Sequence, residues 1–324
     1  MMSACSAPQE SLYKEQILVF GTLVDVSFWG ADPALAQRAS VELHQLFERI
    51  HSRWHAWQPG MLMRINERLA ASHSIAVDDD AMALLRRSAE LSRASGGLFD
   101  PAIGQLIALW GFHNSDLPQG PPPAAQQLEQ LVALQPSMAD LQFADGRLSS
   151  TSSAVQLDMG GVAKGYAIDL AIAKMRELGI SNGIVNAGGD LRAIGRRGER
   201  PWRIGIRNPR GDGAIAAIEV RGDESIFTSG DYERFYQYEG RRYHHIIDPR
   251  SGYPAQGTRS VTVIHSDATT ADAAATALFV AGPSQWRQVA AAMGIEQVMI
   301  IDSSGEISMT AAMKERVVLL NGER

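Results

Sequence analysis

An acid, a pair of glycines and a lysine lie close together in the segment Asp158–Asp169, which reads Asp-Met-Gly-Gly-Val-Ala-Lys-Gly-Tyr-Ala-Ile-Asp. Residues 154–157 before it are typical of a strand, and apolar residues at helical spacing follow it as far as Gly179. At such a strand-to-helix junction, glycines let a ligand approach the backbone, and free N–H groups at the helix start attract anions. Lys164 adds a positive charge, and Asp158 adds an acceptor or a metal-facing anion.

This combination suits a phosphorylated ligand, but a glycine pair before a helix is also often only a tight turn. The segment matches neither the P-loop pattern nor the dinucleotide-binding pattern GxGxxG. Spacing alone therefore names no cofactor.

A second segment combines a carboxylate and a hydroxyl on a helix rich in small residues. A strand is predicted at about 259–264 and a helix at about 270–281, which Gly-Pro would end. Asp272 and Thr276 are four residues apart and therefore share one helical face. Both are hard oxygen donors of the kind that magnesium prefers. The alternative is that Asp272 caps the helix and Thr276 bonds back to a carbonyl.

A third segment brings two histidines to the end of a strand. Strands are predicted at about 232–238 and 241–247 around a Glu-Gly turn. The second strand would deliver His244 and His245 to opposite faces before the turn at Asp248. A histidine at a strand end can act as a general base near neutral pH, although more often such a residue only makes structural hydrogen bonds.

Taken together, these segments resemble the ApbE-type FAD:protein FMN transferases. The D-x-G-G-[IV]-A-K-G-Y-A-x-D pattern of that family occurs in full, and its other patterns follow the family's order. The matching segments are 96–112, 158–169, 186–190, 228–232, 245–252 and 271–276, and residues 20–22 stand where the family usually has M-G-T. The resemblance extends from about residue 17 to 310. Six patterns in one order are far more specific than any one of them.

The resemblance implies a role for individual residues. It implies FAD contacts at Phe20, Trp57, Leu98, Phe99, Asp100, Asp158, Lys164, His245 and Ile247. It implies magnesium ligands at Asp272, Thr276 and the carbonyls of Gly161 and Ala275. Trp57 stands where the family has a ring-stacking aromatic, usually tyrosine, and an indole can also stack on an isoalloxazine. Around Trp57 the chain is one residue shorter than the family pattern.

The implied reaction is attack of an acceptor threonine (or serine) hydroxyl on the FMN-side phosphorus of FAD, with AMP as the leaving group. Magnesium would neutralise developing charge, and Lys164 would assist electrostatically. His245 is the expected base, with Asp248 or a metal-bound group as the alternative. A magnesium-dependent FAD pyrophosphatase and a non-catalytic FAD-binding lipoprotein remain alternative functions. The acceptor would be a flavin-bearing subunit of a membrane redox complex or an exported reductase.

Composition agrees with a folded enzyme. The chain has 324 residues, of which 45% are hydrophobic, and a net charge of −6 with no basic run, which argues against nucleic-acid binding. The one cysteine, Cys5, follows small residues as at a bacterial lipoprotein cleavage site. We therefore expect a periplasmic protein anchored to the membrane through a lipid on Cys5, with a cytoplasmic location as the alternative. Residues 1–16 would form a flexible tail, and residues 17–324 the flavin transferase domain.

The expected fold class is α+β, because helices alternate with many short strands. One strand is predicted at about 17–28, a helix at about 33–55, and another after the three aspartates at 78–80. The family resemblance adds a T-fold-like core in which antiparallel sheets pack against helices.

Overall fold

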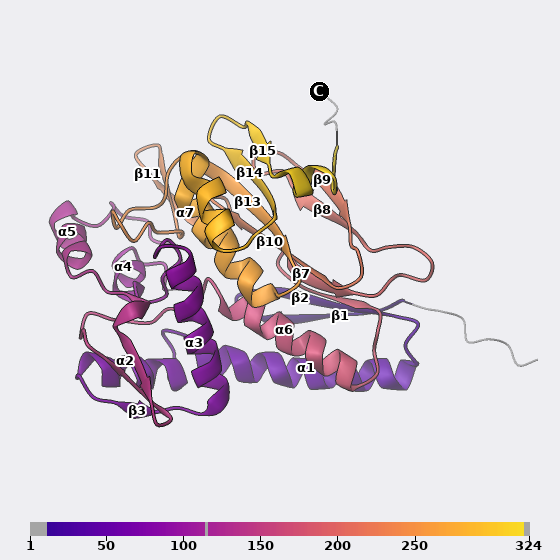
Figure 1. Ribbon diagram of the computed structural model, residues 1–324, viewed down its shortest axis with the longest axis horizontal. Coiled ribbons are helices and arrows are strands. Elements are labelled where there is room, and N and C mark those ends of the chain that lie inside the picture. The colour runs from indigo at the N-terminus through magenta and orange to yellow at the C-terminus, as the bar shows by residue number, and fades with distance from the viewer. Residues whose placement is uncertain (1–11, 114–115, 321–324) are drawn as a thin grey trace, which may run out of the picture.

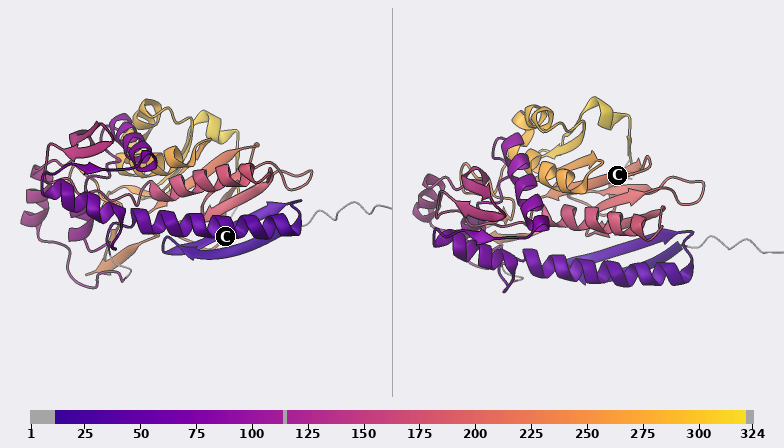
Figure 2. Two further views of the ribbon diagram at one scale, coloured as in Figure 1. Left: turned by 90° about the horizontal axis from the view of Figure 1, so that it is seen from below. Right: turned by 60° about the horizontal axis from the view of Figure 1, so that its bottom comes forward.

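The computed structural model describes residues 12–113 and 116–320, and its centre is an antiparallel eight-stranded sheet (Figure 1). In spatial order the strands are β1 (Leu12–Val19), β2 (Thr22–Trp29), β6 (Gly183–Ala187), β7 (Asp190–Ile194), β10 (Glu224–Gly230), β13 (Thr258–His265), β14 (Gln297–Asp302) and β15 (Ile307–Met309). The helices α1 (Pro33–Trp54), α6 (Ala163–Glu177) and α7 (Ala268–Ala292) cover one face (Figure 2). This arrangement confirms the α+β prediction.

A smaller antiparallel sheet covers part of the other face. Its strands lie in the order β16 (Val317–Leu319), β9 (Ala214–Glu219) and β8 (Arg203–Arg207). Buried side chains such as Trp202 and Ile218 pack there against Ile226 and Ile301 of the large sheet. The central strands are therefore buried on both faces, which explains why β13 carries an almost unbroken run of buried residues.

The remaining elements gather mainly at one end of the large sheet (Figures 1 and 2). They are α2 (Met61–Ala70), β3 (Ile75–Ala76), α3 (Asp79–Ala94), α4 (Gly104–Leu109), α5 (Ala125–Ala133), the 3₁₀ helix η1 (Met138–Asp140), β4 (Leu141–Ala144), β5 (Arg147–Ser150), and the hairpin of β11 (Phe235–Tyr238) with β12 (Arg241–His244). The short α8 (Ala311–Lys314) lies beside β14 instead. Within the described part of the chain, no helix is both long and apolar enough to cross a bilayer.

The prediction of a single strand at 17–28 is wrong, because the chain reverses in the middle of it. β1 and β2 pair as a hairpin whose turn is formed by Phe20 and Gly21, with φ of 56° and 70°. Two-residue hairpin turns of this kind require positive φ at both positions, for which Asn-Gly is the usual signal. Phenylalanine at the first position hides the turn, since it continues the apolar alternation of the flanking strands.

The predicted boundary between a flexible tail and the domain at residue 16 is wrong. β1 begins at Leu12, so residues 12–16 belong to the sheet rather than to a flexible segment. Cys5, the expected lipid attachment site, lies outside the described residues.

Two further expectations concern segments next to the glycine-rich junction and the alanine-rich helix. The predicted strand at residues 154–157 is wrong, because Gln156 makes only an isolated bridge to Ile103.

In α7 the predicted interruption is confirmed, since Gly282 adopts φ of 69° and separates two helical parts. The second part, which begins at Pro283, was not predicted.

The start of α6 lies in direct contact with the start of α7. A Cβ atom on Gly165 would be 2.4 Å from the carbonyl oxygen of Ala268, which no side chain tolerates. In the same place the Gly165 N–H donates to the Asp272 carboxylate at 2.9 Å. Glycine at position 165 therefore sets the spacing between α6, which begins in the glycine-rich segment, and α7, which carries Asp272 and Thr276.

We predict that Gly165→Ala destabilises the fold by about 1–3 kcal/mol or more, because the added methyl group must push α6 away from α7. Urea denaturation of the whole chain measures this loss. Gly120→Ala is the matched control, since a Cβ there would meet nothing within 4 Å. Equal stability of the two variants would contradict the close contact between the helices.

Candidate active site

The glycine-rich segment forms a tight turn that leads into α6. The Asp158 carboxylate accepts a hydrogen bond from the N–H of Gly160 at 2.8 Å, which holds the turn. Burial raises the pKa of Asp158, while that N–H and the nearby charges of Arg234 and His113 act in the opposite direction. Asp158 is thus a turn-forming acid in a poorly solvated position.

Three of the expected metal ligands meet where this turn passes α7. A Cβ on Gly161 would lie 3.4 Å from the Thr276 hydroxyl and 3.4 Å from the Phe99 ring. Asp272, one turn before Thr276, is 5% exposed and reaches the first turn of α6. The N-cap of α7 is Asp267, so the alternative in which Asp272 caps its own helix is wrong.

The chemistry of these donors fits a hard divalent cation. Burial raises the pKa of Asp272 to about 7, which Lys164 opposes and Asp190 reinforces. No group of three or more His, Cys, Asp or Glu side chains suited to a metal occurs within the described residues. A cation here would therefore rely on hydroxyl and carbonyl oxygens as well as on Asp272, which are ligands that magnesium accepts.

Lys164 lies within a group of acidic side chains. Its ammonium forms an ion pair with Asp190, the first residue of β7. Burial disfavours the charged lysine, but Asp190, Asp272 and Glu233 together raise its pKa above the usual range. Burial also raises the pKa of Glu233 to about 7, with Lys164 acting against the shift. One ammonium therefore faces three carboxyl groups.

The two histidines separate as predicted. His244 is buried, its Nε2 lies 2.9 Å from the carbonyl oxygen of Ala255, and its ring packs edge-on against Phe279. The Nδ1 of His245 lies 3.2 Å from the carbonyl oxygen of Arg234. Because a carbonyl only accepts, Nδ1 carries the proton and Nε2 keeps its lone pair.

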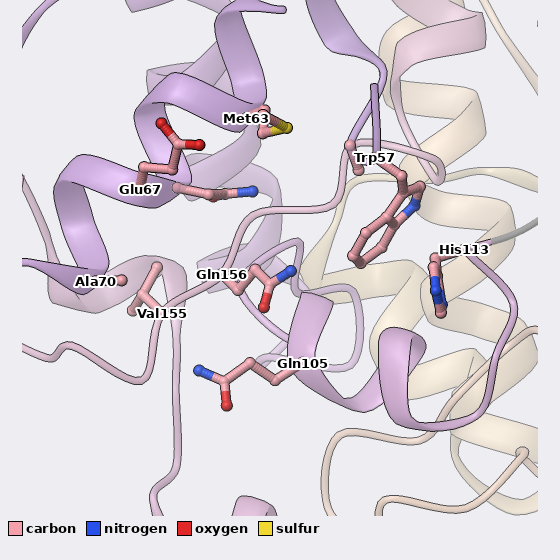
Figure 3. Close-up of a pocket in the computed structure, with 10 residues that line it drawn as sticks. Trp57, Met63, Glu67, Ala70, Gln105, His113, Val155 and Gln156 are labelled. Atoms are coloured by element: carbon pink, nitrogen blue, oxygen red, sulfur yellow. The ribbon is translucent and has the colours of Figure 1, made fainter. Parts of the chain in front are cut away.

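A separate cavity of about 430 Å³ opens between α2 and α4. Figure 3 shows the indole of Trp57 near the ring of His113, with the amides of Gln105 and Gln156 to the left of the two rings. The two ring centroids are 4.7 Å apart, and the Nδ1 of His113 is buried without a hydrogen-bond partner. Glu67 adds a carboxylate to the lining. Aromatic and amide groups of this kind suit a flat heterocycle.

Comparison with known proteins places the chain in a family. The model of the ApbE family matches residues 20–299. The chain belongs to the ApbE family. A FAD:protein FMN transferase of Rhodobacter capsulatus is 41% identical over 308 residues, which are 95% of this chain but 59% of that protein. A protein of the same name from Treponema pallidum is 33% identical, with 83% of this chain and 79% of that protein covered.

Solved structures agree with this assignment. The ApbE protein of Thermotoga maritima superimposes with a TM-score of 0.87 at 31% identity, covering 94% of this chain and 99% of that one. The flavin transferase ApbE of Vibrio cholerae gives a TM-score of 0.83 at 27% identity, covering 95% and 100%. The ApbE-type core of antiparallel sheet and helices expected from the sequence is thereby confirmed.

Several of the residues that the family resemblance predicts to contact FAD are packed against other parts of the protein. Leu98, Phe99 and Ile247 are buried, and Phe99 contacts the Gly161 turn. Phe20 packs edge-on against His51, with ring centroids 5.6 Å apart. The carboxylate of Asp100 has structural partners: it accepts bonds from Ser92, Ala102, Ser137 and Met138. It therefore ties neighbouring loops together.

Three residues of this region were given no role from the sequence. Asp190 is the last residue of the matched segment 186–190 (N-x-G-G-D), and Glu233 directly follows the matched segment 228–232 (T-S-G-D-Y). His113 directly follows the matched segment 96–112, which ends in W-G-F. Position next to a motif was the only available signal, because charge pairing and pocket lining depend on contacts between distant segments.

We predict that His245 makes folding sensitive to acid. Burial, with a contribution from the neighbouring His244, lowers the pKa of His245 to about 3. A histidine in the unfolded chain has a pKa of about 6.5. The unfolded chain therefore binds a proton that the folded protein excludes, and stability falls as the pH drops below about 6.5. Denaturant titrations at pH 7.5 and 5 should show a smaller acid-induced loss in His245→Gln than in the unchanged protein.

His73→Gln, at an exposed position, is the control for this comparison. It should lose as much stability between the two pH values as the unchanged protein. An identical loss in His245→Gln would show that the imidazole is not held neutral by the fold.

Proposed function

We propose that this protein transfers the FMN half of FAD to the hydroxyl of a threonine or serine in an acceptor flavoprotein, in a magnesium-dependent reaction that releases AMP. The observation that carries the proposal is the meeting of Gly161, Asp272 and Thr276 beside Phe99 at the start of α6. The names of the ApbE relatives support it, although the chain spans only 59% of the Rhodobacter capsulatus protein.

The start of α6 is suited to bind the phosphates. The positive end of the α6 dipole and the ammonium of Lys164 attract anions. The N–H groups of Val162, Ala163 and Gly165 already donate within the protein, so the attraction comes from the helix dipole and the lysine. Asp272, Thr276 and the carbonyls of Gly161 and Ala275 would hold magnesium, which supplies charge neutralisation at phosphate oxygens. Asp272 also accepts the Gly165 N–H, so the same carboxylate aligns the helix start with the metal ligands.

His245 would accept the proton of the acceptor hydroxyl at Nε2, since its Nδ1–H is directed to the carbonyl of Arg234. As the hydroxyl oxygen forms its bond to the FMN-side phosphorus, the bond from that phosphorus to the bridging oxygen breaks. AMP leaves with that oxygen. The ligand-free pKa of about 3 makes His245 a weak base, and a bound anionic pyrophosphate would raise it. Asp248 is the poorer candidate, because its carboxylate forms an ion pair with Arg250.

The cavity beside Trp57 would hold the flavin ring. Stacking on the indole and hydrogen bonds to the amides of Gln105 and Gln156 would orient it. The acceptor, by resemblance to the family, would be a subunit of a membrane redox complex or an exported reductase, and we propose a periplasmic location with a lipid on Cys5.

Mass spectrometry of a mixture of the protein, FAD, magnesium and a threonine-containing acceptor fragment tests the proposal. We expect the acceptor to gain the mass of the FMN group while AMP is released. Asp272→Ala should lower the labelling rate by at least about 100-fold, since it removes the carboxylate among the metal ligands. Asp212→Ala, at an exposed loop position, should label at the normal rate.

Other products would lead to other functions. Release of free FMN and AMP with no labelled acceptor would favour an FAD pyrophosphatase. Intact FAD, bound but never cleaved with or without magnesium, would favour a binding protein.

A further inference from the structure

Lys164 is held by a partner on the sheet. Its Cα belongs to the first turn of α6, while its ammonium pairs with the carboxylate of Asp190 at the start of β7. The lysine side chain is 26% exposed, but that of Asp190 is only 6% exposed. A ligand at the start of α6 can therefore contact Lys164 while Asp190 stays behind it.

Asp190 is itself fixed by the neighbouring strand. Its second carboxylate oxygen accepts the N–H of Thr228 on β10 at 2.9 Å. One carboxylate thus joins the N-x-G-G-D turn, the T-S-G strand and the lysine of the glycine-rich motif. A free lysine side chain samples many rotamers, and this pairing removes much of that freedom before any ligand arrives.

Of the three acidic residues near Lys164, only Asp190 is the hydrogen-bond partner of its ammonium. Glu233 and Asp272 both act on the charge of Lys164. The segment before Glu233 is clamped, because Arg210 pairs with Asp231 and Arg207 lies over the ring of Tyr232 at 5.2 Å. Asp190 is the acid of the three whose carboxylate forms a hydrogen bond with the ammonium.

We propose that Asp190 is a positioning residue, which holds the Lys164 ammonium so that its remaining two N–H donors face the anionic groups of the ligand. The inference rests on the proposed function for the identity of that ligand, FAD. Asp190 makes no contact with the ligand; its effect on FAD binding passes through Lys164.

A double-mutant cycle on FAD binding tests this role. The dissociation constant of FAD is measured by flavin fluorescence, without acceptor, for the unchanged protein, Asp190→Asn, Lys164→Met and the double variant. Asparagine keeps an oxygen for the Thr228 N–H but cannot pair with an ammonium. We expect Asp190→Asn to weaken FAD binding about tenfold, in line with the loss of one charged hydrogen bond. We expect no further loss when it is added to Lys164→Met.

Additive losses in the cycle would overturn the proposal, since Asp190 would then affect binding independently of Lys164. The matched control is Glu224→Gln, which breaks the buried ion pair between Arg316 and Glu224 on β10, the strand that also carries Thr228. It should lower the melting temperature and leave FAD affinity unchanged. An equal loss of affinity in the control would assign the effect to general weakening of the sheet, which also overturns the proposal.

The outcome is separate from that of the transfer assay. If the effects of the two substitutions on FAD binding are coupled but no acceptor is labelled, the role of Asp190 stands and the proposed transferase activity is rejected. If an acceptor is labelled but the two effects on FAD binding are additive, the transferase activity stands and the role of Asp190 is rejected.

Should Asp190→Asn fail to fold, nitrogen-15 NMR of the lysine ammonium groups tests the unchanged protein. The Lys164 signal should be visible through slow hydrogen exchange and should move when FAD is added. A Lys164 ammonium that exchanges as fast as surface lysines would overturn the proposal.

Discussion

The contact between the first turns of α6 and α7 is the constraint on which the candidate site depends. Gly165 lets the two backbones approach, and Asp272 spans the gap by accepting the Gly165 N–H. The glycine-rich turn, Lys164 and the α7 oxygen donors reach one place only because these helices cross there. α7 is rich in alanine for the same reason: side chains larger than a methyl group would separate it from the sheet and from α6.

This close packing creates an electrostatic problem that a ligand would solve. Asp190 pairs with the Lys164 ammonium, the charges of Asp272 and Glu233 act on the same ammonium, and partial burial limits their screening by water. Burial, with a smaller contribution from the neighbouring carboxylates, raises the pKa values of Asp272 and Glu233. A divalent cation bound together with an anionic phosphate would bring a positive charge close to these carboxylates.

The sequence predicted the motif-bearing elements well and the pairing of distant segments poorly. The N-terminal part of α7, the separation of His244 from His245, and the α+β class all follow from spacing. The hairpin at Phe20 was missed because a phenylalanine in the left-handed region carries no turn signal. The roles of Asp190 and His113 could not be derived, since each depends on a partner dozens of residues away: Lys164 for one and Trp57 for the other.

The open sheet has two edges, and both are poorly suited to accept another strand. On β1, the outermost strand at one side, Lys14, Glu15 and Gln16 form an exposed polar run. At the other side β15 has only three residues. Charged or short edge strands discourage pairing between chains. A polypeptide that approaches either edge of the large sheet therefore finds a poor backbone template to extend.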